Sequence, residues 1–166
     1  MNGMFTPNEE RLQMDQARRA NLAKTRRWRA VMLFWTWFQA LGALLGGTMG
    51  MLYPHGEFYG GESMVESLGK LPFSDSVLSS MFVPALALAV LIGVGNLVAA
   101  VLIMRQVRAG AVIACAEGLV IVCFTVAEIA ILGSNVLSWV YCVFGIAQFL
   151  CGLRYFRCLD GWRTGK

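Results

Sequence analysis

Two glutamates could do chemistry in this chain because they lie inside an otherwise apolar stretch. Glu117 and Glu128 are eleven residues apart in the segment 109–132, which holds no other charged residue. At about 100° and 1.5 Å per residue, a helix would place both on one stripe, about 16 Å apart. This separation excludes a close carboxylate pair within one chain. The two groups could still mark a single polar path along one helix face.

Each of the other three apolar stretches holds one amide at a membrane depth similar to that of Glu117, counted from the centre of the stretch. These residues are Gln39, Asn96 and Gln148. One interpretation is an internal polar site centred on Glu117, hydrogen-bonded by these amides, that binds a proton, a cation or a lipid headgroup. The other is structural hydrogen bonding between helices, worth about 0.6 kcal/mol per bond on average in membranes. We favour the structural role for the amides.

For Glu117 we favour a functional role, because Gln or Ser would serve a purely structural bond at lower cost in hydrocarbon. Apart from Arg29 and Arg154 at the ends of the first and last stretches, the apolar stretches contain no basic residue that could pair with it. We therefore expect a largely neutral acid at this position.

No other residue pattern predicts catalysis or metal binding. None of the five cysteines forms a CxxC pair, and the single histidine, His55, is far from all of them in the sequence; the cysteines are Cys115, Cys123, Cys142, Cys151 and Cys158. We therefore expect no metal site, no cofactor and no disulfide framework. Without HExxH, GxSxG or a visible nucleophile–base pair, an enzyme has no positive support and ranks third among the function classes.

Four apolar stretches long enough to cross a bilayer must position these polar groups. The chain is 57% hydrophobic and 14% charged, against roughly 45–50% and 25% in soluble domains. A span needs about 20 mostly apolar residues, and the segments that qualify are 28–52, 81–104, 109–132 and 137–156. The sequence predicts an all-α polytopic membrane protein with four transmembrane helices in an antiparallel bundle.

The basic residues predict the orientation. All but one of the 14 lysines and arginines lie before or at the start of the first span, between the second and third, or at the end of the last span and beyond it. By the positive-inside rule both termini are cytoplasmic. We divide the chain into a basic, partly helical segment 1–27, a membrane domain 28–156 and a tail 157–166. The basic segment is expected to lie against anionic headgroups, at about 1 kcal/mol per basic residue, which leaves nucleic-acid binding unnecessary as an explanation.

The long connection 53–80 is expected on the extracytoplasmic side of the membrane. Its glycines and prolines predict repeated turns, with a short helix at 62–68 between them. That helix would form a structural cap over the outer end of the helices or lie in the membrane interface. The functional alternative is a lid over a site.

Small residues at four-residue spacing predict close helix contacts. They form the series Gly42, Gly46, Gly50 in the first span and Gly110, Ala114, Gly118 in the third. Such spacing lets membrane helices approach closely, within one chain or between chains. Gly46 is the best candidate for an oligomer contact.

The order of glycines, prolines and one asparagine resembles that of a group of small, uncharacterised four-helix bacterial membrane proteins. The shared features are Gly46-Gly47, Pro54-x-Gly56, Pro72-Phe73, Pro84, Gly93-x-Gly95-Asn96 and Arg105-x2-Arg108. The resemblance covers residues 40–155. It implies the fold and a bacterial inner membrane, and it implies no activity.

The sequence supports two hypotheses for function. The first is a non-catalytic interaction or accessory subunit that self-associates or binds another membrane protein. The second is a small transporter or channel component that uses Glu117 and Glu128. The surroundings of Glu117 should separate them, since a cavity around it favours transport and dry packing against the amides favours a structural role.

Overall fold

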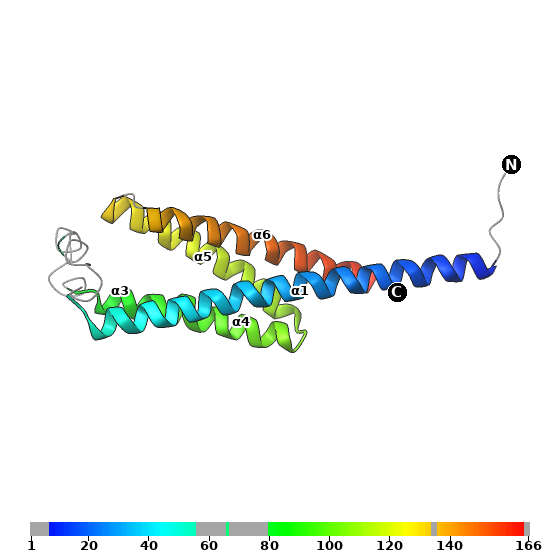
Figure 1. The fold of residues 1–166 in the computed structure, drawn as a ribbon, viewed down its shortest axis with the longest axis horizontal. Helices are drawn as coiled ribbons and strands as arrows, with labels where there is room; N and C mark the ends of the chain where they lie inside the picture. Colours follow the sequence, from blue (N-terminus) through cyan, green and yellow to red (C-terminus); the bar gives the residue numbers. More distant parts are fainter. Residues whose placement is uncertain (1–6, 56–65, 67–79, 134–135, 165–166) are drawn as a thin grey trace.

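The computed structural model describes residues 7–55, 66, 80–133 and 136–164, and every regular element in these parts is a helix (Figure 1). Four helices are long and apolar enough to cross a membrane: Arg11–Leu52, Phe82–Met104, Arg108–Ala130 and Ser138–Leu159. The prediction of an all-helical chain with four helices of membrane-spanning length is therefore confirmed. The predicted cap or lid at 62–68 falls outside the described residues, apart from Glu66.

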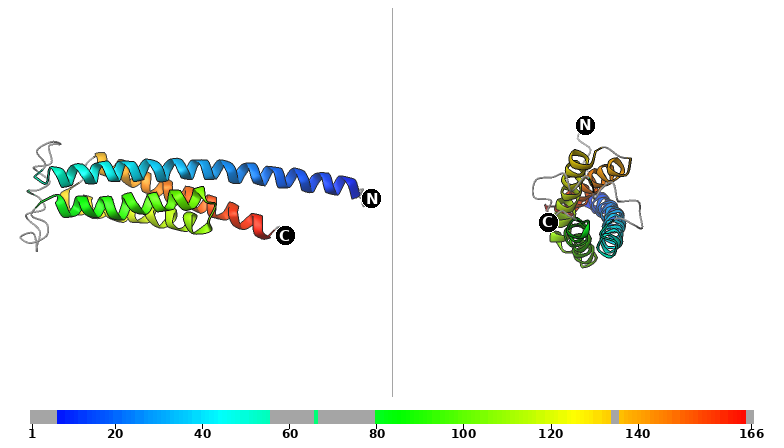
Figure 2. Two further views of the ribbon diagram at one scale, coloured as in Figure 1. Left: turned by 90° about the horizontal axis from the view of Figure 1, so that it is seen from below. Right: turned by 90° about the vertical axis from the view of Figure 1, so that its left-hand side faces the viewer.

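Helix α1 (Pro7–Leu52) joins the basic segment and the first span into one rod of 46 residues. No glycine or proline interrupts it between Asn8 and Leu41, and the Thr25 hydroxyl donates to the Asn21 carbonyl at 2.9 Å. The helix is about 69 Å long at 1.5 Å per residue, more than twice the thickness of a hydrocarbon core. Its first part extends straight beyond all other helices (Figures 1 and 2).

The second span contains a π-helical segment that the sequence analysis did not predict. It consists of α3 (Phe82–Ala87), η2 (Leu88–Val94) and α4 (Gly95–Met104), which succeed one another without a break. A π-helix bonds each N–H five residues back, so it inserts extra residues and rotates the next part of the helix. The Asn96 side chain, just after η2, donates to the Ile92 carbonyl at 2.9 Å.

The third and fourth spans are α5 (Arg108–Leu132) and α6 (Val136–Thr164), and α6 continues past the predicted end at residue 156. The helix α1 packs against α3, η2 and α4 on one side and against α6 on the other, while α5 packs against α4 and α6. Seen end-on, the four spans form a closed ring (Figure 2). Just after the C-terminal end of α1, the Pro54 carbonyl accepts a hydrogen bond from the Met81 N–H at 2.8 Å. This bond joins the two ends of the long connection.

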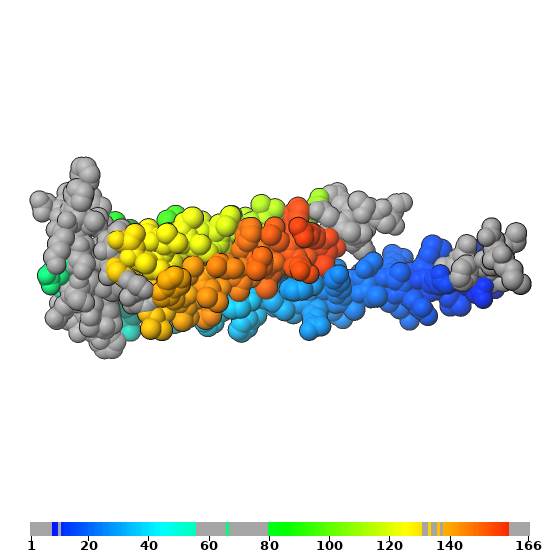
Figure 3. Space-filling model, turned by 90° about the horizontal axis from the view of Figure 1, so that it is seen from above, coloured from blue at the N-terminus to red at the C-terminus, as the bar shows by residue number. Residues whose placement is uncertain are grey.

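Apart from Tyr155, the buried residues are small or medium-sized, and many large apolar side chains face outward. The main core cluster joins Met32, Ala99, Ile103, Ala111, Ala114 and Tyr155, all 0–1% exposed. Phe34, Leu45 and Leu91 are 57–68% exposed, and the molecule is an elongated rod (Figure 3). An apolar outside over a tightly packed inside is what a lipid environment favours.

The glycines of α1 make a close contact, but of the predicted series Gly42, Gly46 and Gly50 only Gly50 takes part, together with Gly47. A Cβ added at Gly47 would lie 2.6 Å from the Ala89 Cβ, and one at Gly50 would lie 2.6 Å from the Ala85 Cβ. At Gly46 the nearest atom would be the Leu88 Cδ2 at 3.7 Å, and at Gly42 nothing lies within 4 Å. The buried stripe is therefore Ala43, Gly47 and Gly50.

In α5 the predicted small residues are all buried. Gly110 packs against the backbone of Ile103, Ala114 is fully buried, and Gly118 faces the backbone of α6. A Cβ at Gly118 would lie 2.7 Å from the Phe149 nitrogen, so α5 and α6 are in backbone contact there. On α6, Gly145 and Gly152 supply the matching surface.

Candidate functional site

A buried pair of amides ties three spans together. The Gln148 side chain on α6 donates from Nε2 to the Asn96 Oδ1 on α4 at 2.7 Å and to the Ala114 carbonyl on α5 at 3.1 Å. Both amide residues are 0% exposed. Bonds of this kind hold helices in register where no water can compete. The π-helical turn before α4 and the register of α6 decide that these two side chains meet.

Glu117 lies near this pair along the helices but is not bonded to it. Its carboxyl group fits against Gly95 of α4, where any Cβ would collide with Oε1 and would lie 2.6 Å from Cδ. Its Oε2 atom is buried and has no hydrogen-bond partner among the atoms that the structure describes. The missing side chain of Gly95 thus leaves the space that the carboxyl group fills, and we call this space the notch.

The expected hydrogen bonds from the three amides to Glu117 are absent from the described part of the chain. Two of the amides are bonded to other groups, and the third lies on a helix that does not pack against α5. Gln148 directs Nε2 to Asn96 and to Ala114, and Asn96 donates to Ile92. Gln39 is 4% exposed on α1, and its Nε2 has no partner within the described atoms. The helix α1 packs against α4 and α6 rather than against α5, which carries Glu117. Gln39 therefore lies in the contacts of α1 with those helices.

Glu128 has a partner that the sequence analysis missed. It accepts a hydrogen bond from the Ser138 hydroxyl, on the first turn of α6, at 3.0 Å. Ser138 is fully buried. The two carboxyl groups of α5 therefore differ: Glu128 is bonded across the contact between α5 and α6, and Glu117 has an oxygen without a partner.

Gly95 is the other residue that the sequence analysis passed over. A glycine in a membrane helix has many structural explanations, and its proximity to Glu117 depends on how α4 and α5 pack. The adjacent pair Gly95-Asn96 was a usable signal, because a small and a polar residue together in an apolar run often mark a helix contact.

The described residues contain no group of three His, Cys, Asp or Glu side chains that could hold a metal. All five cysteines are free thiols.

No protein-family model, curated protein or solved structure matches this chain. Glu117 contacts Gly95 rather than the amides, and it does not line the pocket found between α1 and α6, so its surroundings meet neither condition that was expected to separate the two hypotheses. The function is therefore argued from the geometry alone: a carboxyl group in an apolar region, against a glycine, with one oxygen that has no partner among the described atoms.

Proposed function

We propose that this chain is a non-catalytic membrane protein that takes up and releases a proton at Glu117, as a small transporter or channel component. It forms an antiparallel four-helix bundle in a bacterial cytoplasmic membrane, with both termini inside. The observation that carries the proposal is the Glu117 Oε2 atom, which is buried and unpartnered beside Gly95.

A carboxylate in hydrocarbon must be neutralised, and three groups could do so. A basic side chain from another chain cannot reach Oε2, because that atom has almost no exposed surface. A metal cation needs several oxygen ligands, and the Asn96 oxygen already accepts from Gln148. A proton needs no further ligand and fits the notch, so the geometry favours it.

Self-association as an interaction or accessory subunit is the second candidate function. The observation in its favour is the outward face of α1 around Gly42 and Gly46, both of which are exposed. Gly42 has open space where a side chain would be, so a second helix could approach its backbone closely.

The proton proposal is tested in proteoliposomes. A hydrophobic carbodiimide modifies protonated carboxyl groups in apolar surroundings, and peptide mapping would locate the adduct. We expect modification of Glu117, slowing as the pH rises. Under an imposed pH gradient, followed with an entrapped dye, wild type should dissipate the gradient and Glu117→Gln should not.

Glu128→Gln is the matched control, because it removes a carboxyl group from the same helix that is already hydrogen-bonded. It should keep the flux of the wild type. Thermal unfolding of each variant in detergent checks that the proteins are folded. Equal proton flux in Glu117→Gln and wild type would reduce Glu117 to a structural acid and remove the proposal.

A further inference from the structure

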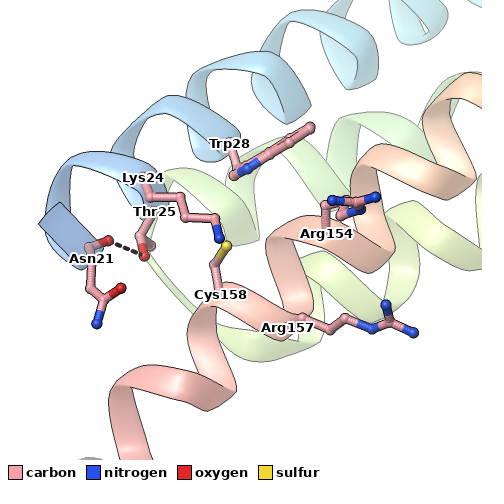
Figure 4. Close-up of a pocket in the computed structure, with 7 residues that line it drawn as sticks. All are labelled: Asn21, Lys24, Thr25, Trp28, Arg154, Arg157 and Cys158. Atoms are coloured by element: carbon pink, nitrogen blue, oxygen red, sulfur yellow. Dashed lines mark hydrogen bonds between the residues drawn. The ribbon is translucent and has the colours of Figure 1, made fainter.

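A pocket opens between α1 and α6 near the ends that carry most of the basic residues. It measures about 270 Å³ and is lined by Asn21, Lys24, Thr25 and Trp28 of α1 and by Arg154, Arg157 and Cys158 of α6 (Figure 4). The Lys24 side chain extends from α1 toward Cys158, and Arg154 lies beside Trp28. We call this the basic pocket.

Its three cations differ from their neighbours in having no partner within the described part of the chain. Arg29 donates to the Met104 carbonyl at 2.7 Å, and the Arg108 guanidinium lies 5.5 Å from the centre of the Phe156 ring. No hydrogen bond or ion pair is found for Lys24, Arg154 or Arg157 among the described residues; the Asp160 side chain lies outside them. The three side chains line one pocket from two helices, and like charges held in one region repel one another unless an anion offsets them.

The level of the pocket along the helices indicates which anion. The stretch of α1 without charged residues begins at Ala30, and that of α6 ends at Leu153. Trp28 and Arg154 therefore mark the boundary between hydrocarbon and headgroups, where tryptophan and arginine are favoured. By contrast, Arg18 lies ten residues before Trp28 on the same straight helix, about 15 Å further out. That distance exceeds the screening length of about 8 Å at physiological salt.

We propose that the basic pocket binds the phosphate groups of an anionic phospholipid headgroup. Arg154 and Arg157 would hold phosphate oxygens through paired N–H donors, the geometry that guanidinium groups match best. Lys24 would add a third positive charge from α1, and Trp28 would contact the glycerol region. Three cations suit a headgroup with two phosphates better than one with a single phosphate. The volume lies just below the roughly 300–1,000 Å³ of drug-sized ligand pockets, which fits a headgroup.

This inference is independent of the proton proposal, because Glu117 takes no part in it. The test uses the purified full chain in phosphatidylcholine micelles, titrated with cardiolipin, phosphatidylglycerol or further phosphatidylcholine, with bound lipid counted by native mass spectrometry. Wild type should retain cardiolipin most strongly. The variant Lys24→Gln/Arg154→Gln/Arg157→Gln should bind it roughly 100-fold more weakly, at about five-fold per basic residue.

The matched control is Arg11→Gln/Arg18→Gln/Arg19→Gln, which removes the same charge from α1 residues that lie at least nine residues, or about 14 Å, beyond Trp28 and outside the pocket. It should bind cardiolipin within about two-fold of wild type. The single variant Lys24→Gln repeats the test if the triple variant unfolds. Equal loss in pocket and control variants would show general surface attraction and overturn the site. Displacement of cardiolipin by equimolar inorganic phosphate would assign the pocket to a soluble ligand and overturn the lipid assignment.

Discussion

Gly95 determines how the Glu117 carboxyl group can sit between α4 and α5. The carboxyl carbon lies where a side chain at position 95 would begin. A larger residue would push the carboxyl group toward lipid, where its oxygens would find neither protein partners nor water. The proton-binding role proposed for Glu117 therefore depends on a residue with no chemistry of its own.

We predict that Gly95→Ala lowers stability and that removal of the carboxyl group rescues it. An added methyl group in a close contact costs typically about 1–3 kcal/mol. In Gly95→Ala/Glu117→Ala the obstructing atoms are gone, so a double-mutant cycle should give a coupling of about 0.5–3 kcal/mol. Thermal unfolding in detergent measures each corner of the cycle.

Gly42→Ala is the control for this cycle, because a side chain there meets nothing within 4 Å. It should leave the melting temperature of the protein almost unchanged. If Gly95→Ala were equally destabilising with and without Glu117, the two residues would not share a contact and the notch would lose its significance.

The sequence drew attention to the polar residues of the spans, but it could not show which of them are hydrogen-bonded to one another. Their depth can be counted along the chain, whereas their partners depend on helix rotation. The π-helical turn of η2 rotates Asn96 relative to α3, and nothing in LAVLIGV distinguishes that turn from an ordinary helix. Ser138 opens α6 and meets Glu128 only because of the register between α5 and α6.

At the scale of elements, the contact of α1 with the second span depends on one face of α1. Gly47 and Gly50 approach Ala85 and Ala89 so closely that no side chain would fit. One turn away, Gly42 faces outward. Small residues at 42, 46 and 50 predicted a contact of this kind, but Gly46-Gly47 is a pair, and the sequence could not show which of the two glycines faces the neighbour.

We predict that Gly47→Leu disrupts the fold and Gly42→Leu does not. At Gly47 the new side chain would force α1 away from Ala85 and Ala89, with a loss of more than about 3 kcal/mol, as for severe overpacking. Thermal unfolding should show a large drop for Gly47→Leu and little change for Gly42→Leu. Native mass measured on the same samples addresses self-association: a shift to monomer in Gly42→Leu alone would assign its face to an oligomer contact.

The two ends of the molecule differ. One end carries most of the basic residues, and at the opposite end the long connection joins α1 to the second span. α1 extends beyond the other helices at the basic end, so only its residues near Lys24 to Arg29 lie level with the last turns of α4 and α6. The sequence showed that basic residues gather on one side. It could not show that α1 is straight, and so it predicted contact with headgroups along the whole basic segment. The proposed basic pocket would concentrate that contact on residues of α1 and α6 at one level.

The last prediction concerns the orientation of the molecule. In a variant lacking native cysteines, Glu66→Cys should react with a membrane-impermeant maleimide added to intact cells, because the connection 53–80 is proposed to lie outside. Val107→Cys, in the exposed turn between α4 and α5, and Arg18→Cys should react only after permeabilisation. Alanine is the suitable replacement at Cys115, because its sulfur packs against Gly152. Labelling of Val107→Cys from outside would reverse the orientation. The basic pocket would then face the outer leaflet, while the contact between Glu117 and Gly95 would be unaffected.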